Sequence, residues 1–315
     1  MVNKKNKMLR PTNWLLLIAL VSVCGCADRN TPLGPNTQEY LAIRATFDVK
    51  KDNGPVVIIV PVGFADLTGS FRVEGTLPDL PMLTPDKNVE VCGTSSIPSP
   101  ELVTGPNQTL ANVLVYLHTK IDVNDPKWVS EKYDLEKNPS QKIKVFDQQK
   151  CVFLDRVFAI RTNQTMRIKN SDPVLHNTAL KPTEGGATTF DQSIPAGSHI
   201  DRAVGDDTLR PFRVACAVHP WMSAWMITRK DPYFAKSQLN GTFKIEQIPA
   251  GSVEEPLRLE FRVWHEGKNV RKKFLVSATV NGKDQKWTNS GKIKLDFVAN
   301  QTLDLKVRIS ADAFK

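Results

Sequence analysis

The stretch Cys216-Ala217-Val218-His219-Pro220-Trp221-Met222 places a thiolate, an imidazole and a thioether within seven consecutive residues. These are the ligand types of a trigonal copper site, which uses two His, one Cys and a weakly bound axial Met. One loop therefore offers three of the four ligands, and a second His must come from elsewhere in the chain. Met226 is an alternative axial residue, but it would require a longer loop.

The second histidine must be one of the other four in the chain. His176 is the best candidate, because it follows the alternating pattern 166–169 and therefore sits in a loop at the end of a strand. Phe212, Val214 and Cys216 share one parity, so the sulfur should point into the core with two apolar side chains. We expect the remaining histidines to lie at the surface or to be hydrogen-bonded at the edge of the core: His118, His199 and His265.

The pair His176-Asn177 at a strand end, followed 40 positions later by Cys-x2-His-x2-Met, resembles the type-1 blue copper cupredoxins. The short ligand loop, with proline directly after its histidine, is most similar to the amicyanin and plastocyanin type. The resemblance covers residues 140–229 and implies a Greek-key β-sandwich with one type-1 copper. The ligands it implies are His176, Cys216, His219 and Met222.

The resemblance also assigns roles to the residues around the ligands. The N–H of Asn177 would bond the ligand sulfur, and its side chain would tie the two loops together. His219 would be the partly exposed edge through which electrons pass, and the flanking Pro220 and Trp221 would form an apolar docking patch for a redox protein partner.

Four protein ligands leave no open coordination position, and no serine elbow, phosphate loop or paired-carboxylate motif is found elsewhere. We therefore expect a carrier of single electrons and no enzyme. A copper-delivery or surface scaffold protein without an electron-transfer role is the alternative.

Outside the copper motif the chain alternates with a period of two. Leu257–Val263 and Leu303–Ile309 alternate cleanly, Val113–Leu117 is a short apolar run, and Asn281-Gly282 marks a turn. No long stretch has the 3.6-residue period of a helix. The pattern predicts an all-β protein made of sandwiches of short antiparallel strands.

Residues 240–251, Asn-Gly-Thr-Phe-Lys-Ile-Glu-Gln-Ile-Pro-Ala-Gly, resemble the signature of carboxypeptidase-regulatory or transthyretin-like β-sandwiches. The resemblance implies a second sandwich over residues 230–315, with opening strands within residues 55–125. In one arrangement the cupredoxin unit 140–229 interrupts this second sandwich. In the other, two sandwiches follow in series and residues 55–229 form one enlarged cupredoxin.

The first 26 residues carry the features of an export signal. Four basic residues among the first ten precede the apolar run 14–23, which is too short to cross a bilayer. Val23-Cys24-Gly25-Cys26 resembles a bacterial lipobox with Cys26 as the lipidated residue. We expect an exported lipoprotein, anchored on the periplasmic or cell-surface face of a bacterial membrane, with residues 27–54 as its tether. An ordinary signal peptide is the alternative.

The cysteine count suits an exported chain. Of the five cysteines, Cys92, Cys151 and Cys216 lie beyond the lipobox. An odd thiol in an oxidising compartment is unusual unless it is paired or ligated. We expect a disulfide between Cys92 and Cys151, with Cys216 left for the metal; three free buried thiols are the alternative.

The formal net charge of +9 is moderate, and the basic residues are scattered along the chain. No nucleic-acid-binding motif accompanies them, so we expect no nucleic-acid partner.

Overall fold

The computed structural model describes residues 60–182, 185–267, 269–270 and 272–315. The chain divides into two units, 1–58 and 59–315, and every described residue belongs to the second. The predicted signal peptide, Cys26 and the tether 27–54 lie outside the described residues. Within the described part, no helix has both the length and the apolar character needed to span a membrane.

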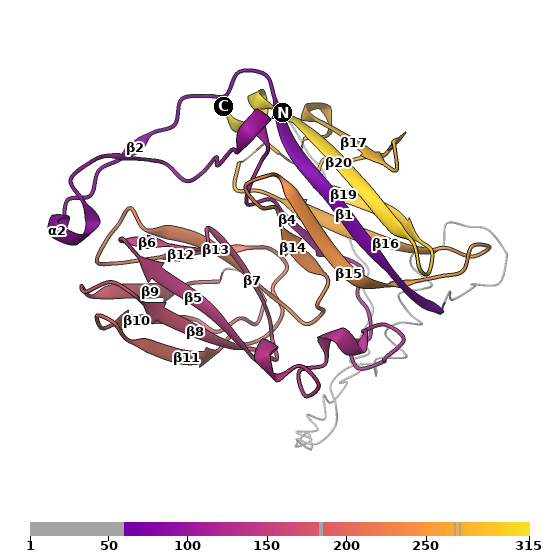
Figure 1. Cartoon of the computed structure of the whole chain (residues 1–315), viewed down its shortest axis with the longest axis horizontal. Coiled ribbons are helices and arrows are strands. Elements are labelled where there is room, and N and C mark those ends of the chain that lie inside the picture. The colour runs from indigo at the N-terminus through magenta and orange to yellow at the C-terminus, as the bar shows by residue number, and fades with distance from the viewer. Residues whose placement is uncertain (1–59, 183–184, 268, 271) are drawn as a thin grey trace, which may run out of the picture. The chain divides into compact units, whose positions relative to one another are not determined.

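The described chain is built of strands arranged in several sheets, and the all-β sandwich prediction is confirmed (Figure 1). Most neighbouring strands are antiparallel, as expected. Three pairs are parallel instead: β1–β20, β5–β8 and β7–β13. Parallel neighbours require a crossover connection, so these pairings cannot be read from adjacent segments of sequence.

Sandwich A consists of two sheets, with strand orders β10-β9-β12-β13-β7 and β11-β8-β5-β6. Side chains from both sheets meet in one core, which includes Phe146, Ile168, Phe158 and Val214. The strands are β5 (Ile143–Gln149), β6 (Val152–Phe153), β7 (Val157–Arg161), β8 (Thr165–Asn170), β9 (His176–Leu180), β10 (Phe190–Ile194), β11 (His199–Ala203), β12 (Phe212–Ala215) and β13 (Ser223–Arg229).

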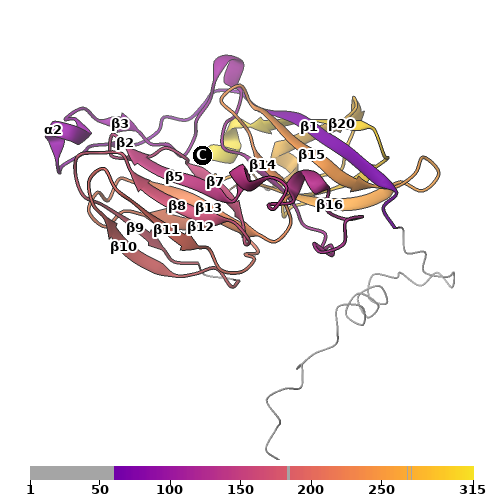
Figure 2. The ribbon, with the colours of Figure 1, turned by 60° about the horizontal axis from the view of Figure 1, so that its bottom comes forward.

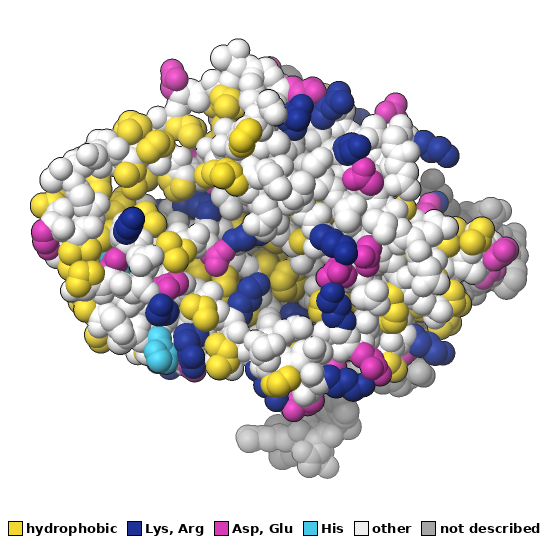
Figure 3. Space-filling view, viewed as in Figure 1, with side chains coloured by type: hydrophobic (Ala, Val, Ile, Leu, Met, Phe, Trp, Pro, Cys, Tyr) yellow, Lys and Arg dark blue, Asp and Glu magenta, His cyan; other side chains and the backbone are white. Residues whose placement is uncertain are grey.

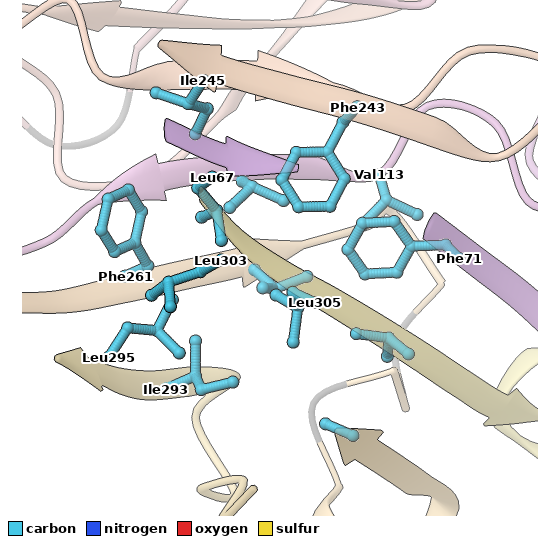
Figure 4. Packing of buried hydrophobic residues seen from close by; sticks show 14 of the residues in the cluster. Leu67, Phe71, Val113, Phe243, Ile245, Phe261, Ile293, Leu295, Leu303 and Leu305 are labelled. Carbon is cyan, nitrogen blue, oxygen red and sulfur yellow. The ribbon is translucent and has the colours of Figure 1, made fainter. Parts of the chain in front are cut away.

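Sandwich B also has two sheets, with strand orders β15-β1-β20-β17-β18 and β14-β4-β16-β19. Figure 4 shows the apolar side chains of its core, drawn from both sheets. The strands are β1 (Gly63–Glu74), β4 (Leu114–Leu117), β14 (Phe234–Lys236), β15 (Thr242–Ala250), β16 (Leu257–Trp264), β17 (Val276–Val280), β18 (Lys283–Asp284), β19 (Lys292–Phe297) and β20 (Thr302–Ser310).

Burial follows the sequence alternation on these strands. On β20, Leu303, Leu305, Val307 and Ile309 are all buried. The strand β4 differs because its four residues are all buried. Val115 and Leu117 belong to the core of sandwich B, whereas Leu114 and Tyr116 pack with residues of β7 and β13 in sandwich A. A strand covered on both faces is apolar throughout, which explains the run Val113–Leu117.

Sandwich B is assembled from segments on both sides of sandwich A in the sequence. The early strand β1 pairs with β15 and β20, and β4 pairs with β14 and β16. All strands of sandwich A lie between β4 and β14. On this ground we propose the interrupted arrangement of the two sandwiches; the exact domain boundaries stay a prediction.

The long connection between β1 and β4 carries the short strands β2 (Met82–Leu83) and β3 (Ile97–Pro98), the one-turn helix α2 (Val89–Cys92) and the 3₁₀ turn η1 (Pro106–Gln108). Figure 1 shows α2 and β2 along this connection, and Figure 2 also shows β3. The other 3₁₀ turns are η2 (Glu131–Tyr133), η3 (Pro139–Gln141), η4 (Lys273–Leu275) and η5 (Ala311–Phe314).

Charged side chains of both signs are interspersed on the face of the molecule shown in Figure 3. The mixture on this face follows from the scattered basic and acidic residues in the sequence. The absence of a nucleic-acid partner stays a prediction.

Candidate metal centre

The structure brings His176, Cys216 and His219 together at one end of sandwich A. One ligand atom from each lies within 4.8 Å of the other two, and all three residues are buried. The Nδ1 atoms of the two rings are 2.8 Å apart, and the sulfur of Cys216 is 3.9 Å from Nδ1 of His219. Three of the four predicted ligands therefore converge in the buried interior.

Neighbouring strands bring the two ligand segments together. His176 is the first residue of β9, and Cys216 directly follows β12. The two strands pair through Ala215↔Ala179, so the start of one and the end of the other meet at the same edge. The loop then closes on itself, because the N–H of Cys216 donates to Met222 O at 3.2 Å and the N–H of Met222 donates to His219 O at 2.9 Å.

The pairing of β12 with β13 separates the two candidate axial methionines. Met222 is buried, and its carbonyl is bonded to the N–H of Cys216. Met226 is also buried, but it lies opposite Phe212 on the neighbouring strand. Phe212 precedes Cys216 by four positions, or roughly 13 Å of extended chain. The geometry therefore favours Met222.

The sulfur of Cys216 accepts two backbone hydrogen bonds. The N–H groups of Asn177 and His219 lie 3.3 and 3.4 Å from it. The Asn177 side chain joins the two loops, because its Oδ1 accepts the N–H of Ala217 at 3.1 Å. Burial raises the pKa of the Cys216 thiol, but the neighbouring His176 and the hydrogen bonds from these N–H groups outweigh it and hold the pKa below its usual value. The site therefore stabilises a thiolate, the form that binds metal.

Each ring meets an oxygen on its outer side. Nε2 of His176 is 2.7 Å from Oδ2 of Asp172, and Nε2 of His219 is 3.0 Å from Oδ1 of Asn88. An oxygen acceptor requires a proton on the facing nitrogen, so both neutral rings leave Nδ1 as a bare lone pair. Two lone pairs 2.8 Å apart repel each other unless a positive charge lies close to them. The two Nδ1 atoms and the sulfur of Cys216 therefore fit a bound metal ion, which would supply that charge.

The pKa shifts of the two histidines also indicate that the pocket favours a positive charge near the Nδ1 atoms. Burial lowers the pKa of His176, but the thiolate of Cys216 and the carboxylate of Asp172 outweigh it and raise the pKa above its usual value. Burial, followed by the positive charge of His176, lowers the pKa of His219. The pocket thus stabilises one positive charge shared between two imidazoles and a thiolate. Thiolate, thioether and imidazole together are the ligands that suit copper in both oxidation states.

Asp172 and Asn88 were missed as site residues from sequence. Asp172 precedes His176 by four positions, and this proximity to a ligand is a signal that could have identified it. Asn88 lies 131 positions before His219 and has no local signal. Its contact depends on the segment around α2 reaching the end of sandwich A.

The expected exposure of His219 is not observed. Its side chain has no accessible surface, because Asn88 contacts its outer nitrogen. Pro220 is exposed, and the half-buried ring of Trp221 lies 5.0 Å from the His219 ring, centroid to centroid. Sequence reasoning treated the ligand loop in isolation and could not detect a covering segment supplied by the connection before β4.

A disulfide joins Cys92 to Cys151 across 59 positions of sequence and attaches α2 to the β5–β6 turn. Among the residues that the structure describes, Cys216 is a free and buried cysteine. The N–H of Cys151 also donates to Asp172 at 2.8 Å, and Trp221 Nε1 donates to Cys151 O at 3.1 Å. The disulfide therefore anchors the segment covering His219 beside the partner of His176.

The remaining histidines lie away from the centre. His199 is exposed, and it begins strand β11, where it pairs with Lys169. His118 pairs with Glu260 at 3.6 Å. His265 is buried, and its Nδ1 accepts the N–H of Gly267 at 3.0 Å.

Neither a protein-family model nor a curated protein sequence matches the chain. Solved structures do match at low similarity. A reduced Cu(I) form of an amicyanin variant is 14% identical, with 27% of this chain and 80% of that chain covered and a TM-score of 0.24. A Cu(I) form of another amicyanin variant is 11% identical, with coverages of 38% and 99% and a TM-score of 0.25.

A copper-containing nitrite reductase from Thermus scotoductus SA-01 matches with 15% identity and a TM-score of 0.24. The match covers 27% of this chain and 21% of the reductase, so the chain spans about a fifth of that protein's length. At these values the matches carry no argument about activity, and the function proposed below rests on the geometry of the site.

The expectation that the chain is not an enzyme is contradicted by this last match, since the named protein is a reductase. The expectation assumed that a filled copper donor set of this type excludes catalysis.

Proposed function

We propose that this chain is an exported type-1 copper protein that carries single electrons between redox partners. Its copper would be held by His176, Cys216, His219 and Met222. One observation carries the proposal. The Nδ1 atoms of His176 and His219 and the hydrogen-bonded sulfur of Cys216 lie close together in the buried interior. Because oxygen acceptors hold both Nε2 atoms, the lone pairs of both rings are directed at one position.

Copper bound in this position would supply a one-electron Cu(II)/Cu(I) couple. The protein contributes a donor set that suits both oxidation states. Hydrogen bonds on Cys216, His176 and His219 hold the donors in place. Fixed donors need little rearrangement when charge changes, and burial keeps water from the donor atoms. The exposed Pro220 and the Trp221 ring against His219 offer the nearest surface for a redox protein.

Copper delivery is the competing function. Delivery requires a ligand that can leave the metal and meet an acceptor, whereas both histidines here have no accessible surface. Asn88 and the disulfide of Cys92 further restrain the segment over His219. Burial of the donors therefore favours retention of the metal.

Reduction by ascorbate distinguishes the two functions. Reversible reduction at constant copper content supports electron transfer, whereas release of copper on reduction contradicts it.

The first test is the visible spectrum of copper-loaded protein. Cu(II) bound by the Cys216 thiolate should give an intense thiolate-to-copper band, and Cys216→Ser should abolish it. Met222→Gln should keep copper and the band but shift the reduction potential. Met226→Leu is the matched control, because this buried methionine lies opposite Phe212, away from the donors. Absence of the band in the wild-type protein, or a potential that responds to Met226 instead of Met222, refutes the proposed site.

Attachment to a membrane through lipidated Cys26 completes the proposal. It rests on the lipobox-like sequence and on the disulfide between Cys92 and Cys151, a bond that suits an oxidising compartment. The chain would then act on the periplasmic or cell-surface face of a bacterial membrane. Cys26→Ser should release the protein from the membrane fraction, and unchanged fractionation contradicts lipid anchoring.

A further inference from the structure

A buried carboxylate holds one of the two histidine ligands. Asp172 lies in the connection between β8 and β9 and is 4% exposed. Its Oδ2 is 2.7 Å from Nε2 of His176. The same carboxylate accepts the N–H of Lys150 at 2.6 Å and the N–H of Cys151 at 2.8 Å. Three donors therefore fix the orientation of Asp172 before any metal binds.

The other histidine has a different outer partner. Nε2 of His219 faces the amide oxygen of Asn88 at 3.0 Å, a longer contact to a neutral group. The two rings are otherwise alike, since both are buried and both direct Nδ1 to the same position. The centre thus has one imidazole backed by a carboxylate and one backed by an amide.

A carboxylate that accepts the outer N–H of a metal-bound imidazole fixes its tautomer and makes its other nitrogen a stronger donor. A neutral amide fixes the tautomer but adds less electron density. Stronger donation and a nearby negative charge favour the metal ion with the higher charge, which here is Cu(II) over Cu(I). The unequal partners should therefore affect the reduction potential unequally.

We propose that Asp172 is a positioning residue that holds His176 for metal binding and lowers the reduction potential of the centre, while Asn88 holds His219 with a smaller effect. This inference rests on the proposed copper site. It adds a potential-setting carboxylate to the ligand set.

A purely structural role is the competing explanation for Asp172. Lys150 and Cys151 both have a left-handed backbone, with φ of 52° and 54°, and the carboxylate accepts the N–H groups of both. Asp172 therefore also stabilises the β5–β6 turn. A stabilising role alone should change the free energy of unfolding and leave the potential unchanged, so the potential separates the two explanations.

The experiment compares three substitutions in the copper-loaded chain by spectroelectrochemistry and copper competition. Asp172→Asn removes the negative charge that faces His176 and should weaken Cu(II) binding by roughly 10- to 100-fold, with a smaller effect on Cu(I). If only Cu(II) binding changes, each tenfold loss raises the potential by about 59 mV. Asn88→Asp places a carboxylate against Nε2 of His219 and should lower the potential, by less than the shift at Asp172 because residue 88 is exposed.

Asp191→Asn is the matched control. Asp191 accepts a hydrogen bond from the Asn177 side chain at 2.7 Å, but it does not contact a ligand ring and half of its side chain is exposed. The same charge removal there should leave the potential unchanged, because solvent screens an exposed charge. If Asp172→Asn leaves the potential at the wild-type value, or if Asp191→Asn shifts it equally, the inference is wrong.

Further measurements test the inference even if Asp172→Asn does not fold, and they distinguish its failure from a failure of the proposed function. If Asp172→Asn does not fold, Asn88→Asp decides, and a potential that is unchanged or raised refutes the inference. In the metal-free wild-type chain, ¹⁵N NMR should show the proton of His176 on Nε2, and a proton on Nδ1 alone contradicts the positioning role. A wild-type protein without the thiolate band refutes the proposed function, whereas insensitive potentials with the band present refute only this inference.

Discussion

Acid should destabilise this protein through His265, a buried histidine that lies far from the candidate metal ligands in sequence. The side chain is 4% exposed, its Nδ1 accepts the N–H of Gly267, and its ring lies edge-on to Phe314 at a centroid distance of 5.5 Å. Burial, followed by the positive charge of Arg156, lowers the pKa of His265 from 6.5 to about 3. The folded protein therefore resists protonation of this ring, whereas the unfolded chain does not.

The pH range and the size of the effect follow from the two pKa values. Above pH 6.5 neither state binds the proton, and the full stability is present. As the pH falls from 6.5 toward 3, the unfolded chain gains a proton that the folded protein does not accept. The free energy of unfolding then drops by about 1.4 kcal/mol for each pH unit. At pH 4 the loss attributable to His265 is about 3 kcal/mol.

The assay is urea unfolding of the purified chain at several pH values between 7 and 4, followed by tryptophan fluorescence. The matched variant is His265→Gln, which cannot be protonated and keeps an acceptor for the N–H of Gly267. Its stability at pH 7 differs by a pH-independent packing contribution, but its curve should lack the His265 slope. Other titrating groups, including His118, contribute equally to both proteins. Identical slopes for the two proteins would refute the argument.

Two further predictions concern the connections that support the site and the sandwich beside it. Replacing Cys92 and Cys151 together by Ser should lower the free energy of unfolding by about 4 kcal/mol, since their bond closes 59 positions of chain; a loss below about 1 kcal/mol in urea unfolding contradicts this. Gly241→Ala should destabilise the protein by more than Gly282→Ala. Both glycines have φ near +80°, but an added Cβ at Gly241 would lie 2.5 Å from Phe71 O, whereas nothing lies within 4 Å at Gly282. Backbone strain alone costs about 1 kcal/mol, so equal losses in thermal unfolding would exclude the clash.

Local sequence predicted the features that depend on neighbouring residues. Alternation along segments such as Leu303–Ile309 predicted strands with one buried face, and the structure has that burial. The spacing of Cys216, His219 and Met222 placed candidate ligands on one loop, because a loop of this length cannot separate them widely. The buried position of Cys216 followed from its parity with Phe212 and Val214.

Sequence reasoning failed where it treated the copper motif as a complete description. A filled donor set led to the expectation of no enzyme, although a copper nitrite reductase is among the matching structures. The exposed His219 implied by the resemblance is also not observed. The inference about His219 took the ligand loop as independent of the rest of the chain, whereas the enzyme expectation took four protein ligands as sufficient to exclude catalysis.

Only the tertiary structure determined which distant segments meet. Three features join residues that approach each other only because whole strands pack together. β1 pairs with β20 in parallel, and Asn88 covers His219. The carboxylate of Asp172 lies between His176 and the β5–β6 turn. Periodicity records which face of a strand is buried but not which strand lies beside it. The sequence alone therefore determined the types of candidate ligand and the all-β architecture, whereas the fold determined how those side chains are held and how far they are from solvent.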